Sequence, residues 1–303
     1  MSFKLKNFSI DRFNRDVNNS VPDDSYMRWS AYRREITAFI DRIVEGPRGS
    51  VIVFGAGALN DVDLPYLCDA FGEVVLTDAD VESIGEGIER QRISDVQRAK
   101  IEIVQSDYTG AAAFGLFEKL ESLAKDAVPA DAIAAYIGEA FHMMHGGEGL
   151  RDRRFDFVYA CPVYTQLVYT QIEVFLKILY EYGLYPYDEL NRIVTAAHHH
   201  MQYLLGNYND LMLSVLKDGG RIMVLTDIME MAHGGGMCRE VERLLEDGDT
   251  AGLERRIRDE GLDFGIAGRD DLLSKIDLID TFHMLWPFNE NKEYLIQGIL
   301  GQK

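Results

Sequence analysis

The most informative stretch of this chain is Val51-Ile52-Val53-Phe54-Gly55-Ala56-Gly57-Ala58-Leu59-Asn60-Asp61. It is an apolar, β-rich run that breaks into Gly-x-Gly, and a second apolar run, Val74-Val75-Leu76-Thr77-Asp78, follows it and ends in an acidic residue. This pattern is typical of a strand, a tight turn, a helix and a parallel strand. The glycines let the backbone approach a ligand, and the terminal aspartate can accept both hydroxyls of a ribose. The sequence therefore predicts a nucleotide-like ligand.

The residues after the two glycines indicate which kind of nucleotide. The third glycine of the dinucleotide fingerprint is replaced by Asn60, and the acidic residues Asp61 and Asp63 follow. Carboxylates at a helix start serve an anionic phosphate poorly, whereas a cationic ligand without phosphate, such as S-adenosylmethionine, tolerates acidic neighbours. Alternatively, the turn binds no ligand, and Asp61 or Asp63 only caps the helix that Pro65 begins.

At this point the Gly-x-Gly stretch resembles the first motif of the class I S-adenosylmethionine-dependent methyltransferases, and the run ending at Asp78 resembles their second motif. The resemblance implies an α/β fold: a doubly wound, mainly parallel seven-stranded sheet with an antiparallel last strand, an N-terminal helical cap and helical insertions. The pattern extends from residue 51 to residue 300. We therefore expect a single domain over residues 1–303, with the cap in 1–48 and the Rossmann-like core in 49–303.

Periodicity and turn residues place the other elements. A helix is expected from Glu82 to Arg98, and helical insertions follow the third and fourth strands. The last two strands are separated only by Asn289-Glu290-Asn291, which predicts a hairpin. The remaining strands are predicted at 101–108, at 155–160 and, after a Gly-Gly turn, within 217–227.

The resemblance also implies where the cofactor binds, namely at the ends of the first four strands. Asp78 would hold the ribose, Asp107 would accept a hydrogen bond from the adenine amino group, and Tyr108 would lie against the adenine ring. Asp107 could instead cap the next helix. The cofactor would be S-adenosyl-L-methionine and its product S-adenosyl-L-homocysteine. The complete set of implied contacts is Gly55, Ala56, Gly57, Asn60, Asp78, Ala79, Asp107, Tyr108, Ala160, Cys161 and, from the cap, Tyr32.

An amphipathic helix precedes the first strand, with Trp29, Tyr32, Ile36 and Phe39 at helical spacing. Many members of the family that the chain resembles place such a helix over the cofactor. An aromatic ring there could face the sulfonium, and Arg33 could bind the methionine carboxylate. The alternative is that the aromatic side chains only pack the helix against the core.

The fourth strand runs into Cys161-Pro162-Val163-Tyr164, where the family places substrate-facing residues. Enzymes of this family that methylate exocyclic amines of nucleobases often carry Asn or Asp, Pro, Pro and an aromatic residue here. Cys161 lacks the carbonyl that would accept from such an amine. This departure argues against nucleobase amine methylation.

The charge balance excludes several kinds of partner. The formal net charge of the 303 residues is -19, which repels phosphate backbones and anionic lipids. The three cysteines, Cys68, Cys161 and Cys238, are widely spaced, which suggests neither a disulfide framework nor a zinc cluster. We expect a cytoplasmic protein without nucleic-acid or membrane partners. The sequence does not indicate the oligomeric state.

A general base is needed only if the acceptor keeps its proton at neutral pH. We predict His142, His233 and Asp227 as catalytic candidates, and His145 and His199 are further candidates. The glycines after His233 suggest either a mobile flap over the substrate or a loose connection. No metal site is expected, because a His-Glu-x-x-His pattern is absent and the successive histidines 198–200 point in different directions on a helix.

These features predict an S-adenosylmethionine-dependent methyltransferase that acts on an unidentified small molecule by in-line displacement. Two alternatives share the fold: an aminocarboxypropyl or aminopropyl transferase, and a scaffold that binds S-adenosylmethionine without turnover. A nicotinamide-dependent oxidoreductase is disfavoured by Asn60 and the acidic helix start.

Overall fold

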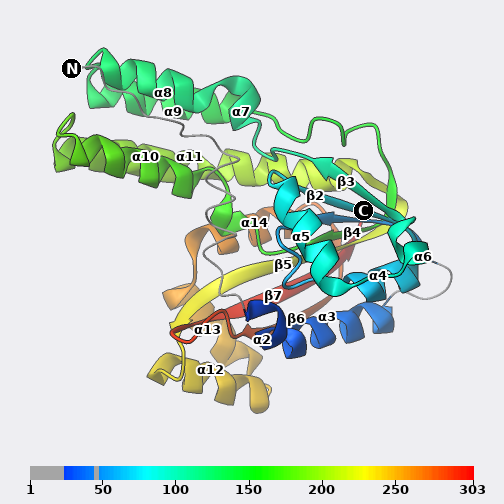
Figure 1. The fold of residues 1–303 in the computed structure, drawn as a ribbon. Helices are drawn as coiled ribbons and strands as arrows, with labels where there is room; N and C mark the ends of the chain where they lie inside the picture. The colour runs from blue at the N-terminus through cyan, green and yellow to red at the C-terminus, as the bar shows by residue number, and fades with distance from the viewer. Residues whose placement is uncertain (1–23, 44–47) are drawn as a thin grey trace.

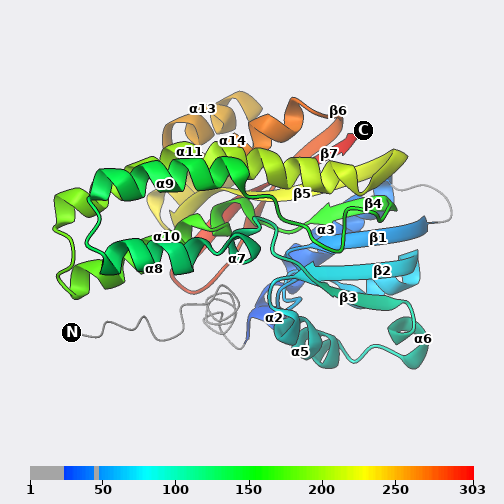
Figure 2. The ribbon, with the colours of Figure 1, turned by 90° about the horizontal axis from the view of Figure 1, so that it is seen from above.

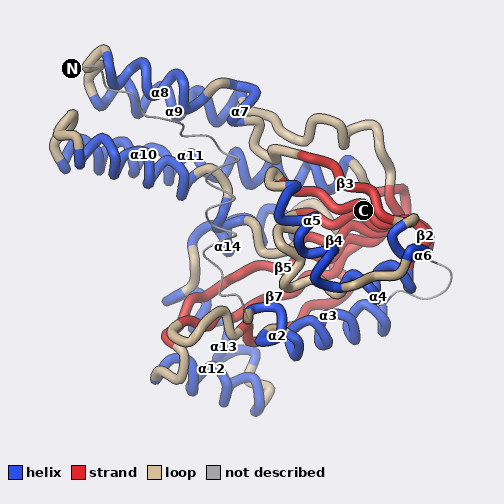
Figure 3. Tube along the Cα trace, in the orientation of Figure 1, coloured by secondary structure: helices blue, strands red, loops and turns tan. Residues whose placement is uncertain are grey.

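The computed structural model of the protein describes residues 24–43 and 48–303. A seven-stranded sheet runs through the molecule with helices packed on both of its faces (Figures 1 and 3). Its strand order is β3-β2-β1-β4-β5-β7-β6. The strands are β1 (Arg48–Phe54), β2 (Phe71–Asp78), β3 (Ile101–Gln105), β4 (Phe155–Ala160), β5 (Leu216–Ala232), β6 (Asp277–Trp286) and β7 (Lys292–Gln302).

The directions of the strands confirm the predicted sheet. β1 pairs in parallel with both β2 and β4, β3 pairs in parallel with β2, and β5 pairs in parallel with β4. β7 is antiparallel to β5 and to β6, so the last strand runs opposite to the other six. β6 and β7 form the hairpin expected from Asn289-Glu290-Asn291.

Helices cover both faces because the central strands are apolar on both sides. Val51 and Val53 of β1 belong to one hydrophobic cluster, whereas Ile52 and Phe54 belong to the other, and all four are fully buried. α3, α4 and α5 pack on the first face, and α7 to α11 with α14 pack on the second. The helices are α2 (Ser25–Arg28), α3 (Ser30–Ile43), α4 (Leu64–Ala70), α5 (Val81–Gln91), α6 (Asp95–Arg98), α7 (Ala111–Phe114), α8 (Leu116–Lys125), α9 (Ala130–Met143), α10 (Tyr169–Glu181), α11 (Tyr187–Ser214), α12 (Gly236–Glu246), α13 (Thr250–Glu260) and α14 (Asp263–Leu273), with a short 3-10 helix η1 (Tyr164–Gln166).

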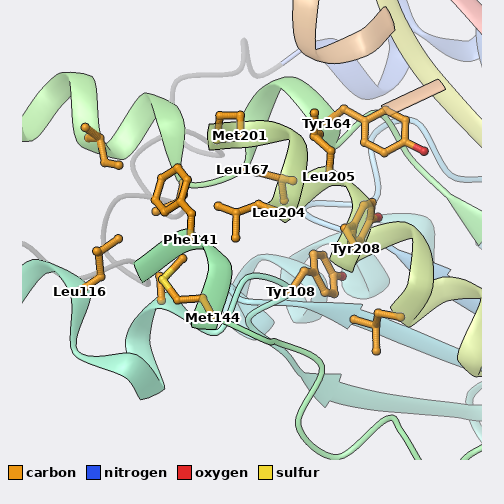
Figure 4. Close-up of a cluster of buried hydrophobic side chains, with 14 of the residues drawn as sticks. Tyr108, Leu116, Phe141, Met144, Tyr164, Leu167, Met201, Leu204, Leu205 and Tyr208 are labelled. Atoms are coloured by element: carbon orange, nitrogen blue, oxygen red, sulfur yellow. The ribbon is translucent and has the colours of Figure 1, made fainter. Parts of the chain in front are cut away.

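The two helical insertions form one arm that projects beyond the sheet (Figures 1 and 2). α11 has 28 residues, which corresponds to a length of about 42 Å, and it continues from the arm into the core. Figure 4 shows buried side chains of α9 and α11, such as Phe141, Met201 and Leu204, packed where the arm meets the sheet.

Several predicted boundaries were wrong for local reasons. The predicted helix from Glu82 to Arg98 ends at Gln91, because Arg92 adopts a left-handed conformation and Ser94 begins α6 with a capping box. β3 ends at Gln105, so the acidic residue predicted at its end lies in the following loop. β5 continues beyond its predicted end to Ala232, because β7 pairs with this extension.

Parts of the predicted N-terminal cap, residues 1–23 and 44–47, lie outside the described residues. The described part is helical, and the side chains of Trp29, Tyr32, Ile36 and Phe39 are buried, as the amphipathic pattern predicts. In the described ranges, no helix combines the length and the apolar character that crossing a membrane requires.

Asn209 joins the long helix to the core. Its side chain is fully buried, accepts a hydrogen bond from the Tyr164 hydroxyl at 2.7 Å, and donates to the Gly268 carbonyl and to the Asp271 carboxylate at 2.9 Å each. We expect Asn209→Ala to lower the free energy of unfolding by about 3 kcal/mol, because it leaves the buried Tyr164 hydroxyl and the buried Gly268 carbonyl without their partner. Urea denaturation measures this loss.

The matched control for this substitution is Asn191→Ala, an exposed position on the same helix. It should change the free energy of unfolding by less than about 0.5 kcal/mol. Equal losses in the two variants would show that helix propensity, and not the buried hydrogen bonds, explains the effect.

Candidate functional site

A cleft lies at the carboxyl ends of β1, β2 and β4, where ligands bind in open α/β sheets. The space between its walls, with the open solvent at its mouth included, is about 1120 Å³. Most of the predicted cofactor residues line it, namely Gly55, Ala56, Gly57, Asn60, Asp78, Ala79, Asp107, Tyr108 and Cys161. Two do not. Ala160 is fully buried in β4, and Tyr32 is buried behind Trp286, with the two rings stacked 5.5 Å apart.

The turn after β1 is held by its neighbours. Gly55 and Gly57 have φ values of 71° and 45°, which other residues adopt only with strain. The Gly55 amide donates to the Tyr108 hydroxyl at 2.8 Å, and that hydroxyl donates to the Thr77 carbonyl at 2.7 Å. The Ala56 amide also donates to the Thr77 carbonyl. The glycine turn is therefore tied to β2 through backbone and side-chain bonds.

Asp78, at the end of β2, faces this turn. One of its carboxylate oxygens accepts from the Gly57 amide and the other from the Asp80 amide, both at 3.0 Å. Each oxygen retains a second acceptor position, so the carboxylate can still bind ligand hydroxyls. Burial raises the pKa of Asp78, and its bonds to backbone amides oppose that shift.

Asp107 and Tyr108, which were both expected to contact adenine, make different contacts in the structure. Oδ1 of Asp107 accepts from the Thr109 amide and hydroxyl and from the Gly110 amide, and Oδ2 accepts from the Ala112 amide. The structure thus shows the alternative role of Asp107, organising the loop that begins α7, while Oδ2 keeps one acceptor position.

The Tyr108 ring packs against Phe54 and Tyr208, with centroids 5.4 and 5.2 Å away, and only 8% of the residue is exposed (Figure 4). This position differs from the expected open face against an adenine ring. The physical reason is the hydroxyl bridge to Gly55 and Thr77, which holds the ring within the core.

An aromatic wall closes one side of the cleft, and we define it as Trp29, Trp286 and Phe288. The ring centroids lie 4.8 to 5.7 Å apart, and the Trp29 indole N–H donates to the Pro287 carbonyl at 3.0 Å. The wall joins the N-terminal helices to the hairpin of β6 and β7. The sequence analysis did not single out Trp286 and Phe288, although an aromatic run just before the hairpin turn was visible there.

Asp61 is a second residue whose role was missed. Asp63, not Asp61, caps α4, since its carboxylate accepts from the Tyr66 amide at 3.1 Å. Asp61 lines the cleft, within hydrogen-bonding reach of the Cys161 thiol. Burial raises the pKa of Asp61 to about 6, and the nearby Arg33 guanidinium opposes this shift.

The cleft is acidic. Among the described residues that line it, Asp61, Asp78 and Asp107 carry carboxyl groups, and none carries an ammonium, guanidinium or imidazole group. The neighbouring Arg33 donates to the Asn60 carbonyl at 2.5 Å and lies 3.8 Å from the centre of the Tyr26 ring. This arrangement favours a cation over a phosphate.

The predicted catalytic histidines do not come together at the cleft. His142 is exposed on α9, with its ring 3.6 Å from that of Tyr203. His233 is exposed beyond the end of β5 and pairs with Glu293 at 2.9 Å. The further candidates His145 and His199 are also exposed and do not line the cleft. None of these histidines is among the residues that line the cleft, so their catalytic role stays a prediction.

The glycines that follow His233 do not line the cleft. Gly234 and Gly235 form a turn, and Gly236 begins α12. These residues follow the end of β5 at Ala232, and a flap over the substrate stays a prediction. The described part of the chain contains no group of three or more acidic, histidine or cysteine side chains that could hold a metal ion.

Asp227 is buried next to the cleft but does not line it. Its Oδ2 accepts a hydrogen bond from the Thr165 hydroxyl, whereas its Oδ1 has no partner among the described residues. Burial raises the pKa of this carboxyl to about 7. Asp227 is not among the lining residues and binds Thr165 instead, so its role as a base stays a prediction.

Comparisons with known proteins give likenesses in structure only. No family model matches the chain, and no curated protein matches it. The solved structures that match with high coverage include many class I S-adenosylmethionine-dependent methyltransferases.

One is the N-methyltransferase NodS from Bradyrhizobium japonicum WM9 in complex with S-adenosyl-L-homocysteine (11% identity, 97% of this chain and 100% of that chain, TM-score 0.45). A second is a putative S-adenosyl-L-methionine-dependent methyltransferase from Methanococcus maripaludis (11% identity, 100% and 97%, TM-score 0.44). A third is TrmN from Thermus thermophilus (10% identity, 92% and 52%, TM-score 0.41). At these TM-scores the likenesses carry no argument about the site, and the fold rests on the strand order described above.

The Tyr108 bridge generates a stability prediction. Tyr108→Phe leaves the Gly55 amide without its acceptor, so we expect the free energy of unfolding to fall by about 2 kcal/mol. The control is Tyr208→Phe in the same cluster, because the Tyr208 hydroxyl is buried without a hydrogen-bond partner among the described residues. That variant should be as stable as the parent or more stable. Chemical denaturation of both variants tests this, and a larger loss in Tyr208→Phe would contradict it.

Asp227 generates a prediction about pH. Its pKa is about 7 in the folded state against an ordinary value of 3.8. Between these values the folded state holds a proton that the unfolded state has lost, so the free energy of unfolding falls as the pH rises through this window. Relative to Asp227→Asn, we expect the parent to lose on the order of 3 kcal/mol between about pH 4 and about pH 8.

Denaturation curves at several pH values measure this difference. Asp218→Asn, which removes an exposed carboxyl from the same strand, is the control and should follow the parent at every pH. Parallel curves for the parent and Asp227→Asn would contradict the prediction.

Proposed function

We propose that the protein is an S-adenosylmethionine-dependent methyltransferase acting on a small molecule. The observation that carries this proposal is the acidic cleft at the carboxyl ends of the parallel strands. Asp61, Asp78 and Asp107 line it, and no cationic side chain of the described residues does so. A sulfonium and an ammonium group are attracted to such a cleft, whereas the pyrophosphate of a dinucleotide is repelled.

The residues present fit the cofactor. The glycine turn allows close approach of the backbone: a Cβ atom on Gly55 would lie 2.3 Å from a methyl group of Val163. Asp78 has acceptor positions for the ribose hydroxyls, and Oδ2 of Asp107 retains one for the adenine amino group. The aromatic wall offers ring faces to a cation.

When bound, S-adenosylmethionine supplies a methyl group on a positively charged sulfur, which is already a reactive donor. The chain therefore has to position the acceptor and exclude water. Trp29 and Phe288 limit access from one side, and Val163 and Leu167 present apolar surface from the other side. Transfer of an aminocarboxypropyl group would use the same donor, but no feature of the described cleft favours it. Nicotinamide chemistry is disfavoured by the acidic lining.

Calorimetric titration tests this proposal. The parent protein should bind S-adenosylmethionine and S-adenosylhomocysteine but not NAD. Asp78→Ala should weaken binding of both sulfur compounds by about tenfold or more, because it removes a charged acceptor of the ribose hydroxyls. Circular dichroism of the variant confirms that it is folded.

The matched control is Glu86→Gln, which removes an exposed carboxyl from α5, the helix that follows Asp78. It should bind as the parent does. Tight binding of NAD, or unchanged binding by Asp78→Ala, would contradict the proposed function.

A further inference from the structure

Asp61 is the carboxyl group of the cleft that the scaffold uses least. Asp78 accepts two backbone amides and Asp107 accepts four hydrogen bonds in its own loop, so both carboxylates help to hold the chain in place. Asp61 interacts with its own backbone amide, and Asp63, not Asp61, caps the helix that follows. Its contact within the cleft is the thiol of Cys161.

This contact places Asp61 beside the end of β4. Cys161 follows β4 and lines the same cleft. It stands where enzymes that methylate nucleobase amines often carry the side-chain carbonyl of Asn or Asp, and it has a thiol instead. Asp61 reaches this position from the loop after β1, the strand that pairs with β4. A carboxyl oxygen is therefore present where the sequence of β4 alone provides only a thiol.

The groups that face Asp61 come from three elements. Arg33 of α3 favours its anionic form, whereas Asp78 of β2 disfavours it. Tyr32 of α3 and Tyr159 of β4 are buried phenols in the same environment, and burial raises the pKa of both. Burial also raises the pKa of Cys161, so its thiol remains neutral and acts as a donor. The two phenols and the thiol therefore stay neutral near pH 7, whereas the Asp61 carboxyl has a pKa of about 6.

The remaining walls of the cleft indicate the charge of a second ligand. The aromatic wall attracts cations, and Gln166 and Gln171 are neutral. No described lining residue could neutralise a carboxylate or a phosphate on an acceptor. An acceptor that enters as a cation gains from Asp61 and from the rings together.

We propose that the acceptor is an amine that enters the cleft as an ammonium ion, and that Asp61 binds this ion and takes its proton. This inference rests on the proposed methyltransferase function. The proton moves from the nitrogen to a carboxylate oxygen of Asp61, and the nitrogen keeps the electron pair and becomes a nucleophile. Asp61 later returns the proton to solvent through the open mouth of the cleft.

The experiment uses calorimetric titration with sinefungin and S-adenosylhomocysteine. Sinefungin is an analogue of S-adenosylmethionine in which a carbon atom with an amino group replaces the sulfur atom with its methyl group, so it presents an ammonium ion near the reaction centre. The parent should bind sinefungin more tightly than S-adenosylhomocysteine at pH 7.5. Asp61→Asn should reduce this preference by about tenfold and leave the affinity for S-adenosylhomocysteine within about twofold.

Asp63→Asn is the matched control, because it removes a carboxyl two residues away and asparagine still caps a helix. It should keep the preference of the parent. In the parent the preference should decrease as the pH falls through about 6, where Asp61 takes up a proton, and in Asp61→Asn this decrease should be absent. Asp78 is present in both proteins, so its titration cancels in the comparison.

The outcomes separate the two proposals. If none of the nucleosides binds the parent, the proposed function fails. If they bind but Asp61→Asn keeps the parent's preference for sinefungin, or loses affinity for both ligands equally, the function stands and the assignment of Asp61 is overturned.

Discussion

The hydrogen bonds that hold the turn after β1 are the constraint on which the site depends. The Tyr108 hydroxyl links the Gly55 amide to the Thr77 carbonyl, and Asp78 accepts from the Gly57 amide. Three neighbouring parallel strands are thereby joined at their carboxyl ends, next to backbone that only glycine adopts without strain. Because this framework is buried and its polar groups are paired, the cleft keeps its shape without a ligand.

Electrostatics explains what such a rigid turn can bind. The same backbone geometry serves phosphates in dinucleotide-binding proteins, where glycines and a helix N-terminus face the anion. Here Asp61 lies in the loop before α4, and Asp78 and Asp107 complete an acidic lining. Arg33, the nearby cation, is engaged with the Asn60 carbonyl and the Tyr26 ring. The chain therefore combines a nucleoside-binding framework with a field that favours positive charge.

The sequence predicted the sheet well, because apolar runs, glycine turns and the final hairpin are local signals. Most of the predicted cofactor residues line the cleft, since strand ends in a parallel sheet meet at one edge. The aromatic wall was not predicted, because it forms only when the N-terminal helices meet a hairpin more than 250 residues away. For the same reason, nothing local indicated that His142 and His233 would contact Tyr203 and Glu293 and not line the cleft.

The most direct test of the account is a crystal structure of the protein with S-adenosylhomocysteine. The account predicts that both ribose hydroxyls bind the Asp78 carboxylate and that the sulfur lies between the glycine turn and Cys161. Adenosine bound elsewhere, or a phosphate-bearing ligand seated in the glycine turn, would contradict it.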